Sequence, residues 1–134
     1  MINIDRLDHL VLTVRDIEST CNFYNRVLGM QVVIFGERRK ALAFGQQKIN
    51  LHQIGEEFEP KANKPTPGSA DLCLIVQEPL SDVEQHLRFC GVEIISGPIE
   101  RTGAMGAIAN DYSWFVMFSR YHTIVKSSWF GLIR

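Results

Sequence analysis

The sequence predicts an α+β fold in which a β-α-β-β-β unit occurs twice along the chain. The order of strand-like and helix-like segments repeats, and the two halves align without a gap at an offset of 62 residues. A polar segment with three prolines, residues 55–68, separates the halves and is predicted to be a linker. With 134 residues, 46% of them apolar, the chain is expected to form one domain over 1–134, with unit one at 5–54 and unit two at 69–134.

The first unit begins with a β-compatible run at residues 7–14. Asp16 suits the N-cap of the helix that follows, because its side-chain oxygen can accept a hydrogen bond from a free backbone N–H group. Gly29 is predicted to end this helix in the left-handed region. The apolar positions of the helix, which recur at spacings of four, three and four, are Ile17, Cys21, Tyr24 and Leu28. Three short strands are then expected at 31–35, 40–44 and 48–53.

The second unit repeats this order. Ser81 and Glu84 form a capping box that predicts the start of a helix, and Gly91 is expected to end it. The apolar side of this helix carries Val83, Leu87 and Cys90. The strands expected around it are at 70–77 and 93–95, followed by a turn-rich stretch at 97–106 and two β-compatible runs within 107–127.

The repeat is most informative on the first strand of each unit. Alternate residues of a strand point to the same face, so Leu10, Leu12 and Val14 share one face. Their counterparts in the second half are identical: Leu72, Leu74 and Val76. Identity is thus kept on the face that is expected to pack against the helix.

Composition and charge exclude several classes of protein. Fourteen Lys and Arg against fifteen Asp and Glu give a net charge of −1, so no general basic excess attracts nucleic acid or a membrane surface. The apolar runs are too short to span a bilayer and no signal segment is recognised, so a cytoplasmic protein is expected. The three cysteines, Cys21, Cys73 and Cys90, are predicted to be buried thiols. The basic cluster 38–40 is interpreted as a solvated hairpin edge, with anion steering as the alternative.

Two histidines and a carboxylate lie on strand faces that point away from the predicted helices. His9 shares its face with Val11, His52 shares its face with Asn50, and Asp71 occupies the position of His9 in the second unit. Imidazole nitrogen and carboxylate oxygen are ligands of borderline divalent metals, so the pattern predicts a metal site. The alternative interpretation is a pair of hydrogen-bonded histidines and an aspartate that caps a strand.

The order of these segments resembles the vicinal oxygen chelate superfamily, the group of glyoxalase I, bleomycin-resistance proteins, fosfomycin-resistance enzymes and extradiol dioxygenases. The opening run 7–17, with Phe23, Tyr24 and the run 27–30, carries the resemblance. Three later runs are similar to the branch of glyoxalase domain-containing protein 5-like and virulence-associated proteins: 44–53, 68–75 and 97–106. The resemblance covers residues 5 to about 108.

The resemblance implies a cupped mixed sheet of paired βαβββ units, assembled as a homodimer. It also implies a divalent metal held by the first and fourth strands, and the positions carried over to this chain are His9, His52 and Asp71. Zinc or nickel is expected, with iron(II) or manganese as alternatives. The metal would bind vicinal oxygens of a small-molecule substrate and stabilise an enolate or oxyanion.

The resemblance ends before an atypical tail at residues 109–134. No Glu follows Glu100, so the tail lacks the carboxylate that relatives supply as a ligand and base. Seven of the thirteen aromatic residues lie in this tail, a change of composition that fits either divergence or a shifted reading frame. His122 lies sixteen residues after Gly106, where relatives carry that Glu, and is predicted to be a fourth metal ligand if the last strand keeps its register. A tail unable to supply the last two strands would leave the second unit with an unpaired edge.

These observations predict a metal-dependent, glyoxalase-type lyase or isomerase, similar to lactoylglutathione lyase if it is active. The catalytic residues stay unassigned, because the missing Glu belongs to the residue class that proton transfer needs. One alternative is a metal-free protein that binds and sequesters a small molecule, as bleomycin-resistance proteins do. Another is an extradiol dioxygenase, because two histidines and a carboxylate resemble an iron(II) site. Neither a nucleic acid nor a membrane is expected as a partner.

Overall fold

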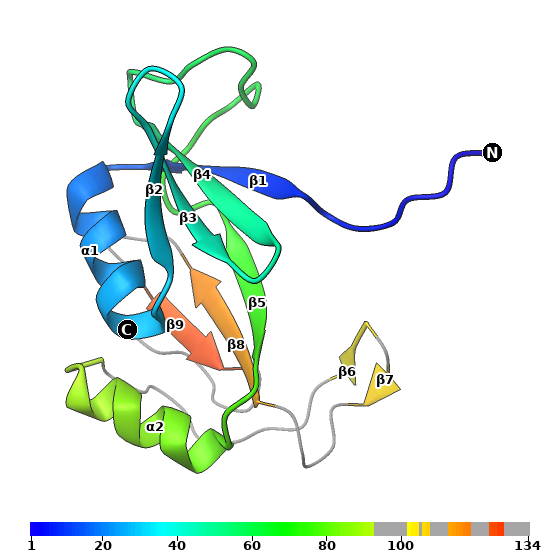
Figure 1. The fold of residues 1–134 in the computed structure, drawn as a ribbon, viewed down its shortest axis with the longest axis vertical. Coiled ribbons are helices and arrows are strands. Elements are labelled where there is room, and N and C mark those ends of the chain that lie inside the picture. The colour runs from blue at the N-terminus through cyan, green and yellow to red at the C-terminus, as the bar shows by residue number, and fades with distance from the viewer. Residues whose placement is uncertain (93–101, 105, 108–112, 119–123, 128–134) are drawn as a thin grey trace. The chain divides into compact units, whose positions relative to one another are not determined.

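A computed structural model gives the fold of the chain and describes residues 1–92, 102–104, 106–107, 113–118 and 124–127. The chain divides into two compact units, Met1–Pro67 and Gly68–Arg134. Helices and strands occur in both units (Figure 1), so the predicted α+β fold class is confirmed. No helix in the described ranges has the length and apolar character needed to cross a membrane.

The first unit is a four-stranded mixed sheet with one helix (Figure 1). Its elements are β1 (His9–Val14), α1 (Ile17–Leu28), β2 (Gln31–Phe35), β3 (Arg39–Phe44) and β4 (Gln47–Gln53). The strand order is β1-β4-β3-β2, in which β1 and β4 are parallel and the other pairs are antiparallel. This arrangement confirms the predicted β-α-β-β-β unit. The first strand begins at His9, two residues later than expected, and Leu7 lies exposed before it.

Helix α1 forms and packs as its sequence predicts. The Oδ1 atom of Asp16 accepts a hydrogen bond from the Ser19 N–H at 2.6 Å, and Gly29 ends the helix with a φ of 66°. The helix contacts β2, β3 and β4. The buried apolar residues of the helix and of the sheet face toward it are Cys21, Tyr24, Val27, Leu12, Val14, Leu42, Ile49 and Leu51. The core of the first unit therefore lies between α1 and one face of the sheet.

The strand register defines the other face of this sheet, called here the helix-free face. Three rows of residues run across it from β1 through β4 and β3 to β2. The first row is His9, Lys48, Ala43 and Gln31; the second is Val11, Asn50, Ala41 and Val33. The third lies beyond the last β3–β4 pair, Ala41 with Asn50, and consists of Thr13 paired with His52 and of Phe35 paired with Arg39. All candidate site residues of the first unit lie on this face.

The second unit has a different sheet. Its elements are β5 (Asp71–Val76), α2 (Leu80–Phe89), β6 (Thr102–Gly103), β7 (Gly106–Ala107), β8 (Ser113–Phe118) and β9 (Ile124–Ser127). The order β5-β8-β9 is antiparallel throughout, whereas the corresponding pair of the first unit, β1 and β4, is parallel. The tail thus supplies two strands, so the condition for an unpaired edge is not met. The expected strand at 93–95 lies outside the described residues.

The predicted capping box of α2 is wrong. The helix begins at Leu80 with Pro79 as its N-cap, and no side chain caps it. Ser81 therefore lies in the first turn, where its hydroxyl donates to Asp82 at 3.1 Å, and Glu84 pairs with Arg88 at 2.5 Å. The physical reason is that the Pro79 carbonyl accepts from the Val83 N–H at 3.2 Å, so the helical hydrogen bonds begin two residues before Ser81 and leave its side chain inside the first turn.

The end of α2 is as predicted. Gly91 follows the last turn with a φ of 72°, in the left-handed region that glycine adopts without strain. The Val92 N–H then donates to the Leu87 carbonyl at 2.9 Å, which satisfies one of the carbonyls left free at the helix end. Val83 and Leu87 are buried and Cys90 is half-buried, so the predicted apolar side of the helix is confirmed for the first two residues.

Candidate functional site

His9 and His52 lie on the helix-free face but not next to each other. In the parallel β1–β4 pair, His9 is opposite Lys48 and His52 is opposite Thr13. This offset of four residues corresponds to about 13 Å along the strands. A metal–imidazole bond measures only about 2 Å. The register of the first unit therefore does not place the two histidines side by side.

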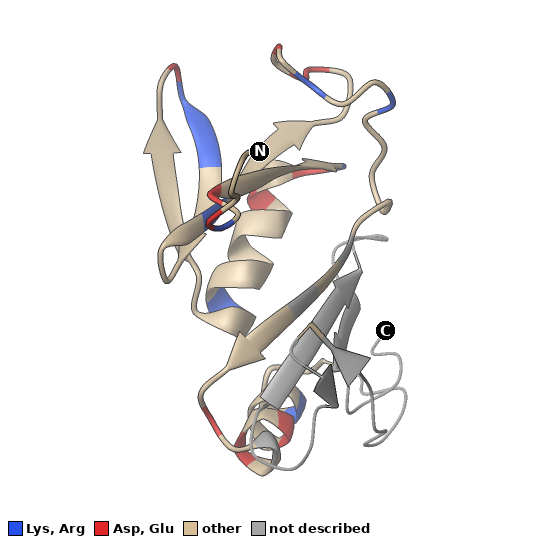
Figure 2. Cartoon of the chain, turned by 90° about the vertical axis from the view of Figure 1, so that its right-hand side faces the viewer, with Lys and Arg blue, Asp and Glu red and all other residues tan. Residues whose placement is uncertain are grey.

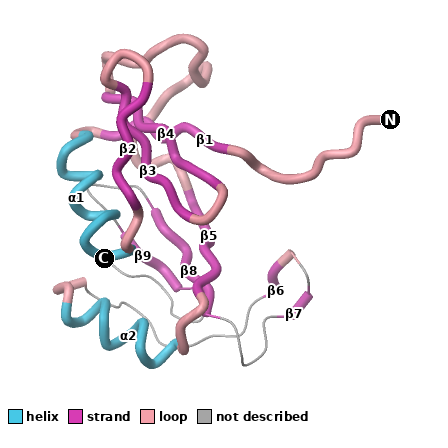
Figure 3. Tube along the Cα trace, in the orientation of Figure 1, coloured by secondary structure: helices cyan, strands magenta, loops and turns pink. Residues whose placement is uncertain are grey.

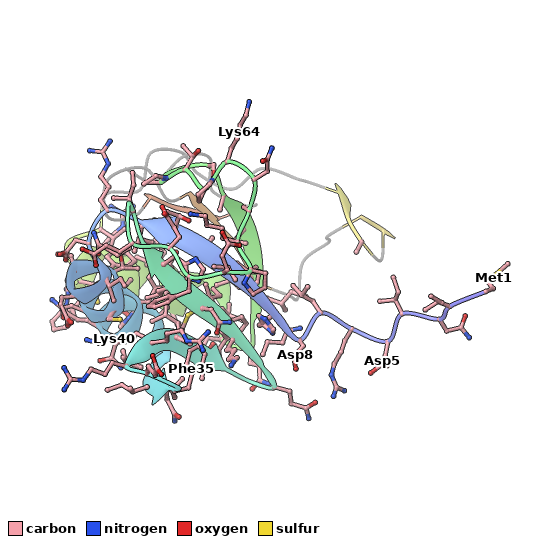
Figure 4. The ribbon with its side chains drawn as sticks, turned by 90° about the horizontal axis from the view of Figure 1, so that it is seen from above. Met1, Asp5, Asp8, Phe35, Lys40 and Lys64 are labelled. Atoms are coloured by element: carbon pink, nitrogen blue, oxygen red, sulfur yellow. The ribbon has the colours of Figure 1, made fainter. Side chains whose placement is uncertain are left out.

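His9 carries a carboxylate partner at the start of β1. Its Nδ1 lies 2.7 Å from Oδ1 of Asp8, and this hydrogen bond is the largest cause that lowers the pKa of the Asp8 carboxyl. Figure 4 labels Asp8 at this position, with Asp5 and Met1 on the extended segment before it. A carboxylate on one ring nitrogen orients the imidazole and leaves the other nitrogen for a metal, as in most metal-binding histidines. His9 therefore fits the role of a ligand through Nε2.

His52 has the opposite surroundings. Only 6% of the residue is exposed, and its Nδ1 has no hydrogen-bond partner in the described part of the chain. Burial is the largest cause that lowers the pKa of the imidazole; Arg39 and Lys61 lower it further, and Glu57 opposes them. The side chain is therefore a neutral imidazole with an unused polar nitrogen.

Asn50 lies on the same face, between the rows of the two histidines. Its Oδ1 is the other buried side-chain polar atom in the described ranges that lacks a hydrogen-bond partner. Sequence reasoning placed Asn50 on this face but assigned it no function. Its alternation with His52 in β4 was the signal that could have found it.

The segment after β4 covers part of this site. Figure 3 shows it as a loop, and its Phe58 ring meets the His52 ring edge to face, with 5.7 Å between the ring centroids. Glu57 accepts a hydrogen bond from the Gly55 N–H at 3.0 Å and pairs with Lys61 at 3.6 Å. The Phe58 contact joins the start of the predicted linker to β4 beside the buried His52, while the Glu57 contacts lie within the loop.

The other two predicted ligands belong to the second unit. Asp71 is the first residue of β5, where it is paired with Phe118 of β8. His122 lies outside the described residues. Within the described ranges, His, Cys, Asp and Glu residues do not assemble in threes or more as a metal site would require. The four-residue ligand set therefore stays a prediction.

Comparison with known proteins places these features in a family. The sequence profile of the Glyoxalase/Bleomycin resistance protein/Dioxygenase superfamily matches residues 6–112. The chain is 59% identical to virulence protein STM3117 of Salmonella typhimurium over 109 residues, which cover 81% of the chain and 76% of that protein. It is 52% identical to glyoxalase domain-containing protein RDO1 of Mycosarcoma maydis over 111 residues, which cover 83% of the chain but less than two thirds, 62%, of that protein.

A solved structure shows the same likeness in three dimensions. The integron cassette protein VCH_CASS1 from the mobile metagenome of V. cholerae superposes with a TM-score of 0.83 and 53% identity. The superposition covers 95% of this chain and 97% of that one. The profile match, the identities and the fold agree, and the chain belongs to the Glyoxalase/Bleomycin resistance protein/Dioxygenase superfamily.

Proposed function

We propose that the chain is a metal-dependent, glyoxalase-type lyase or isomerase that acts on a small substrate with vicinal oxygens. The observation that carries the proposal is the pair of buried polar atoms without partners, His52 Nδ1 and Asn50 Oδ1, on the helix-free face. Leaving such an atom unsatisfied costs about 1–3 kcal/mol, so each one calls for an explanation. A bound ligand that supplies the missing partners is the explanation proposed here.

Each histidine of the first unit offers a nitrogen of a kind that suits a divalent metal. Asp8 orients His9 so that its Nε2 is available, and the buried His52 offers a neutral imidazole nitrogen. Asp71 and His122 are proposed to complete the set, with zinc or nickel preferred over iron(II) or manganese. When bound, the metal would act as a Lewis acid toward the vicinal oxygens. Membership of the superfamily and the name of the relative RDO1, a glyoxalase domain-containing protein, support this function.

The chain's own residues would prepare the site in two ways. Phe58 packs on His52 and excludes water from the imidazole, which strengthens polar interactions made there. The Asn50 amide, held within the sheet between its neighbours in β1 and β3, offers an oxygen in a fixed position. Both features would orient a small molecule before it reacts.

The test measures metal content and turnover separately. Protein purified without chelator is analysed for bound metals, and turnover of methylglyoxal with glutathione is then assayed with added nickel or zinc. His9→Ala should lose both, whereas His86→Ala, which changes an exposed residue of α2, should lose neither. A metal-loaded wild-type protein without turnover on any divalent metal would contradict the lyase but not the metal site.

A metal-free binding protein is the second candidate function. Two observations favour it: no Glu follows Glu100, and the described residues contain no group of three metal-ligand side chains. In that case the purified protein would hold no metal and bind none in titration. Oxygen uptake with catechol and ferrous iron would instead point to an extradiol dioxygenase.

We also propose that the protein is a cytoplasmic homodimer. The free, buried thiol of Cys21 supports a reducing compartment, and the dimer follows from the resemblance alone. Sedimentation equilibrium of the full chain should give twice the monomer mass, and a monomer mass would contradict the dimer.

A further inference from the structure

The basic cluster 38–40 separates into three different environments. Figure 2 shows this stretch in blue at the start of β3. Lys40 points to the helix side and pairs with Glu18 of α1. Arg38 is exposed in the turn, with a φ of 66°. Arg39 alone lies on the helix-free face, in the row of His52.

Two aromatic rings hold Arg39 in place. Its guanidinium carbon lies 5.4 Å from the centroid of the Phe35 ring and 5.5 Å from that of Phe58. The Nζ atom of Lys48 lies 4.2 Å from the same Phe35 ring, which is labelled in Figure 4. Cations are attracted to the faces of aromatic rings, so these contacts position both charges before any ligand arrives. A guanidinium whose position is already restricted loses less entropy when it binds.

Neither cation has a counter-ion in the described part of the chain. The salt bridges found there use other basic residues, and Glu57, the carboxylate of the covering loop, is taken by Lys61. The charge of Lys48 helps to lower the pKa of Asp8, but the two groups form no salt bridge, and the Asp8 carboxylate hydrogen-bonds to His9. Both cations lie against the Phe35 ring, and Arg39 also lies near the buried His52, so this part of the face carries positive charge without a counter-ion in the described residues.

We propose that Arg39, assisted by Lys48, binds an oxyanion group of the small molecule that occupies the helix-free face. The planar guanidinium presents parallel N–H groups that match a carboxylate or a phosphate. The Phe58 ring contacts both Arg39, at 5.5 Å, and His52, at 5.7 Å, so an anion bound to Arg39 lies near His52. The substrate is therefore an acid whose oxyanion lies close to its reacting oxygens. The inference rests on the proposed function only in that a small molecule occupies this face.

The test uses simple anions as probes of the full-length protein. Succinate, inorganic phosphate and the neutral succinamide are titrated into ¹⁵N-labelled protein, first after chelator treatment and then with added zinc. Succinate or phosphate should shift the Arg39 side-chain N–H signal and the amide signals of neighbouring residues in β3 and β4, and succinamide should not. The stronger of the two anions identifies a carboxylate or a phosphate as the preferred group. If the anions shift these signals without zinc and the protein binds no zinc, the anion site is supported and the metal site is not.

Matched variants show whether the site is specific. Arg39→Gln should weaken binding of the preferred anion about tenfold or more, and Lys48→Gln should weaken it less. Arg38→Gln removes the same charge from the neighbouring residue and should change the affinity less than twofold. Arg39→Lys keeps the charge without the planar fork and should restore only part of the loss. Equal losses in Arg39→Gln and Arg38→Gln, or no shift with either anion, would overturn the inference; an amide spectrum that matches wild type shows that each variant is folded.

Discussion

The two histidines of the first unit show how surroundings set the chemistry of one residue type. The His9 Nδ1 atom has the Asp8 carboxylate at 2.7 Å, whereas the His52 Nδ1 atom is buried without a partner. The first arrangement orients a ring that solvent can reach. The second keeps a ring neutral and reserves a polar atom for a ligand. The sequence pattern treats both as strand-face histidines, and only the contacts distinguish them.

Removal of the Asp8 carboxylate should weaken metal binding through His9. Asp8→Asn is expected to lower the affinity for zinc about tenfold to a hundredfold, because the partner of a ligating histidine fixes its orientation and raises its basicity. Competition with a zinc-binding dye measures the affinity. Asp5→Asn is the control, since Asp5 lies on the same exposed segment and pairs with Arg6 instead. Equal effects of the two changes would show that only the local negative charge matters.

The Cys21 thiol should react slowly in the folded protein. Burial is the largest cause that raises the pKa of this thiol, so less of the reactive thiolate exists at a given pH. With Cys73 and Cys90 replaced by Ser, reaction with a disulfide reagent near pH 8 should be at least about tenfold slower than in denaturant. The raised pKa also means that Cys21 favours the folded state at low pH, and this contribution is lost as the pH rises past the ordinary thiol range. Equal rates in the folded and unfolded chains would contradict the burial of Cys21.

The two helices start in different ways although both begin near a residue that can cap. Asp16 accepts the Ser19 N–H, whereas Ser81 is displaced into the first turn of α2 by Pro79. A side chain caps a helix only from the residue just outside it, and Ser81 lies two residues after that position, which Pro79 occupies. The identity of Ser19 and Ser81 across the repeat therefore does not indicate a shared cap.

A pair of alanine variants tests this difference. Asp16→Ala should lower the free energy of unfolding by about 1 kcal/mol, because the N–H that the carboxylate accepts is left free. Ser81→Ala should change it by less than about 0.5 kcal/mol, as is usual for an exposed site without a cap. Urea denaturation followed by circular dichroism measures both. A larger loss for Ser81→Ala than for Asp16→Ala would restore the capping box.

The sheets of the two units differ in the direction of one pairing. β1 pairs in parallel with β4, while β5 pairs antiparallel with β8. Parallel and antiparallel strands have different hydrogen-bond patterns. The residue pairs of β1 with β4 therefore do not predict the residue pairs of β5 with β8. The repeat therefore predicts which residues form the first strand of the second unit and fails to predict how its partner aligns.

The predicted metal site draws on both units of the molecule. His9 and His52 belong to the first unit, and Asp71 and His122 to the second. Within the first unit the two histidines are separated by four residues of register. Asn50 lies in the row between the two, and its buried Oδ1 has no hydrogen-bond partner in the described ranges.

His122 tests whether the tail contributes to the site. His122→Ala is expected to weaken zinc affinity by more than about tenfold without unfolding the protein, because imidazole is a strong zinc ligand. Isothermal titration with zinc measures the affinity, and the melting temperature checks the fold. His9→Ala is the positive control and should abolish binding. An unchanged affinity in His122→Ala, with binding lost in His9→Ala, would make His122 a bystander.

The sequence alone determined the features that depend on neighbouring residues. The order of elements in the first unit, the cap at Asp16 and the glycine ends of both helices follow from local periodicity and backbone preference. The family was also readable, since the resemblance over 5 to about 108 agrees with the profile match over 6–112.

Only the tertiary structure decided what depends on residues distant in the chain. The parallel register of β1 with β4 separates His9 from His52, and cross-strand packing places Arg39 between Phe35 and Phe58. The antiparallel pairing of β5 with β8 likewise arises from hydrogen bonds between segments about forty residues apart. Strand alternation specifies which face a side chain occupies but not its position along that face. That position is set by long-range hydrogen bonding and burial, which no local pattern encodes.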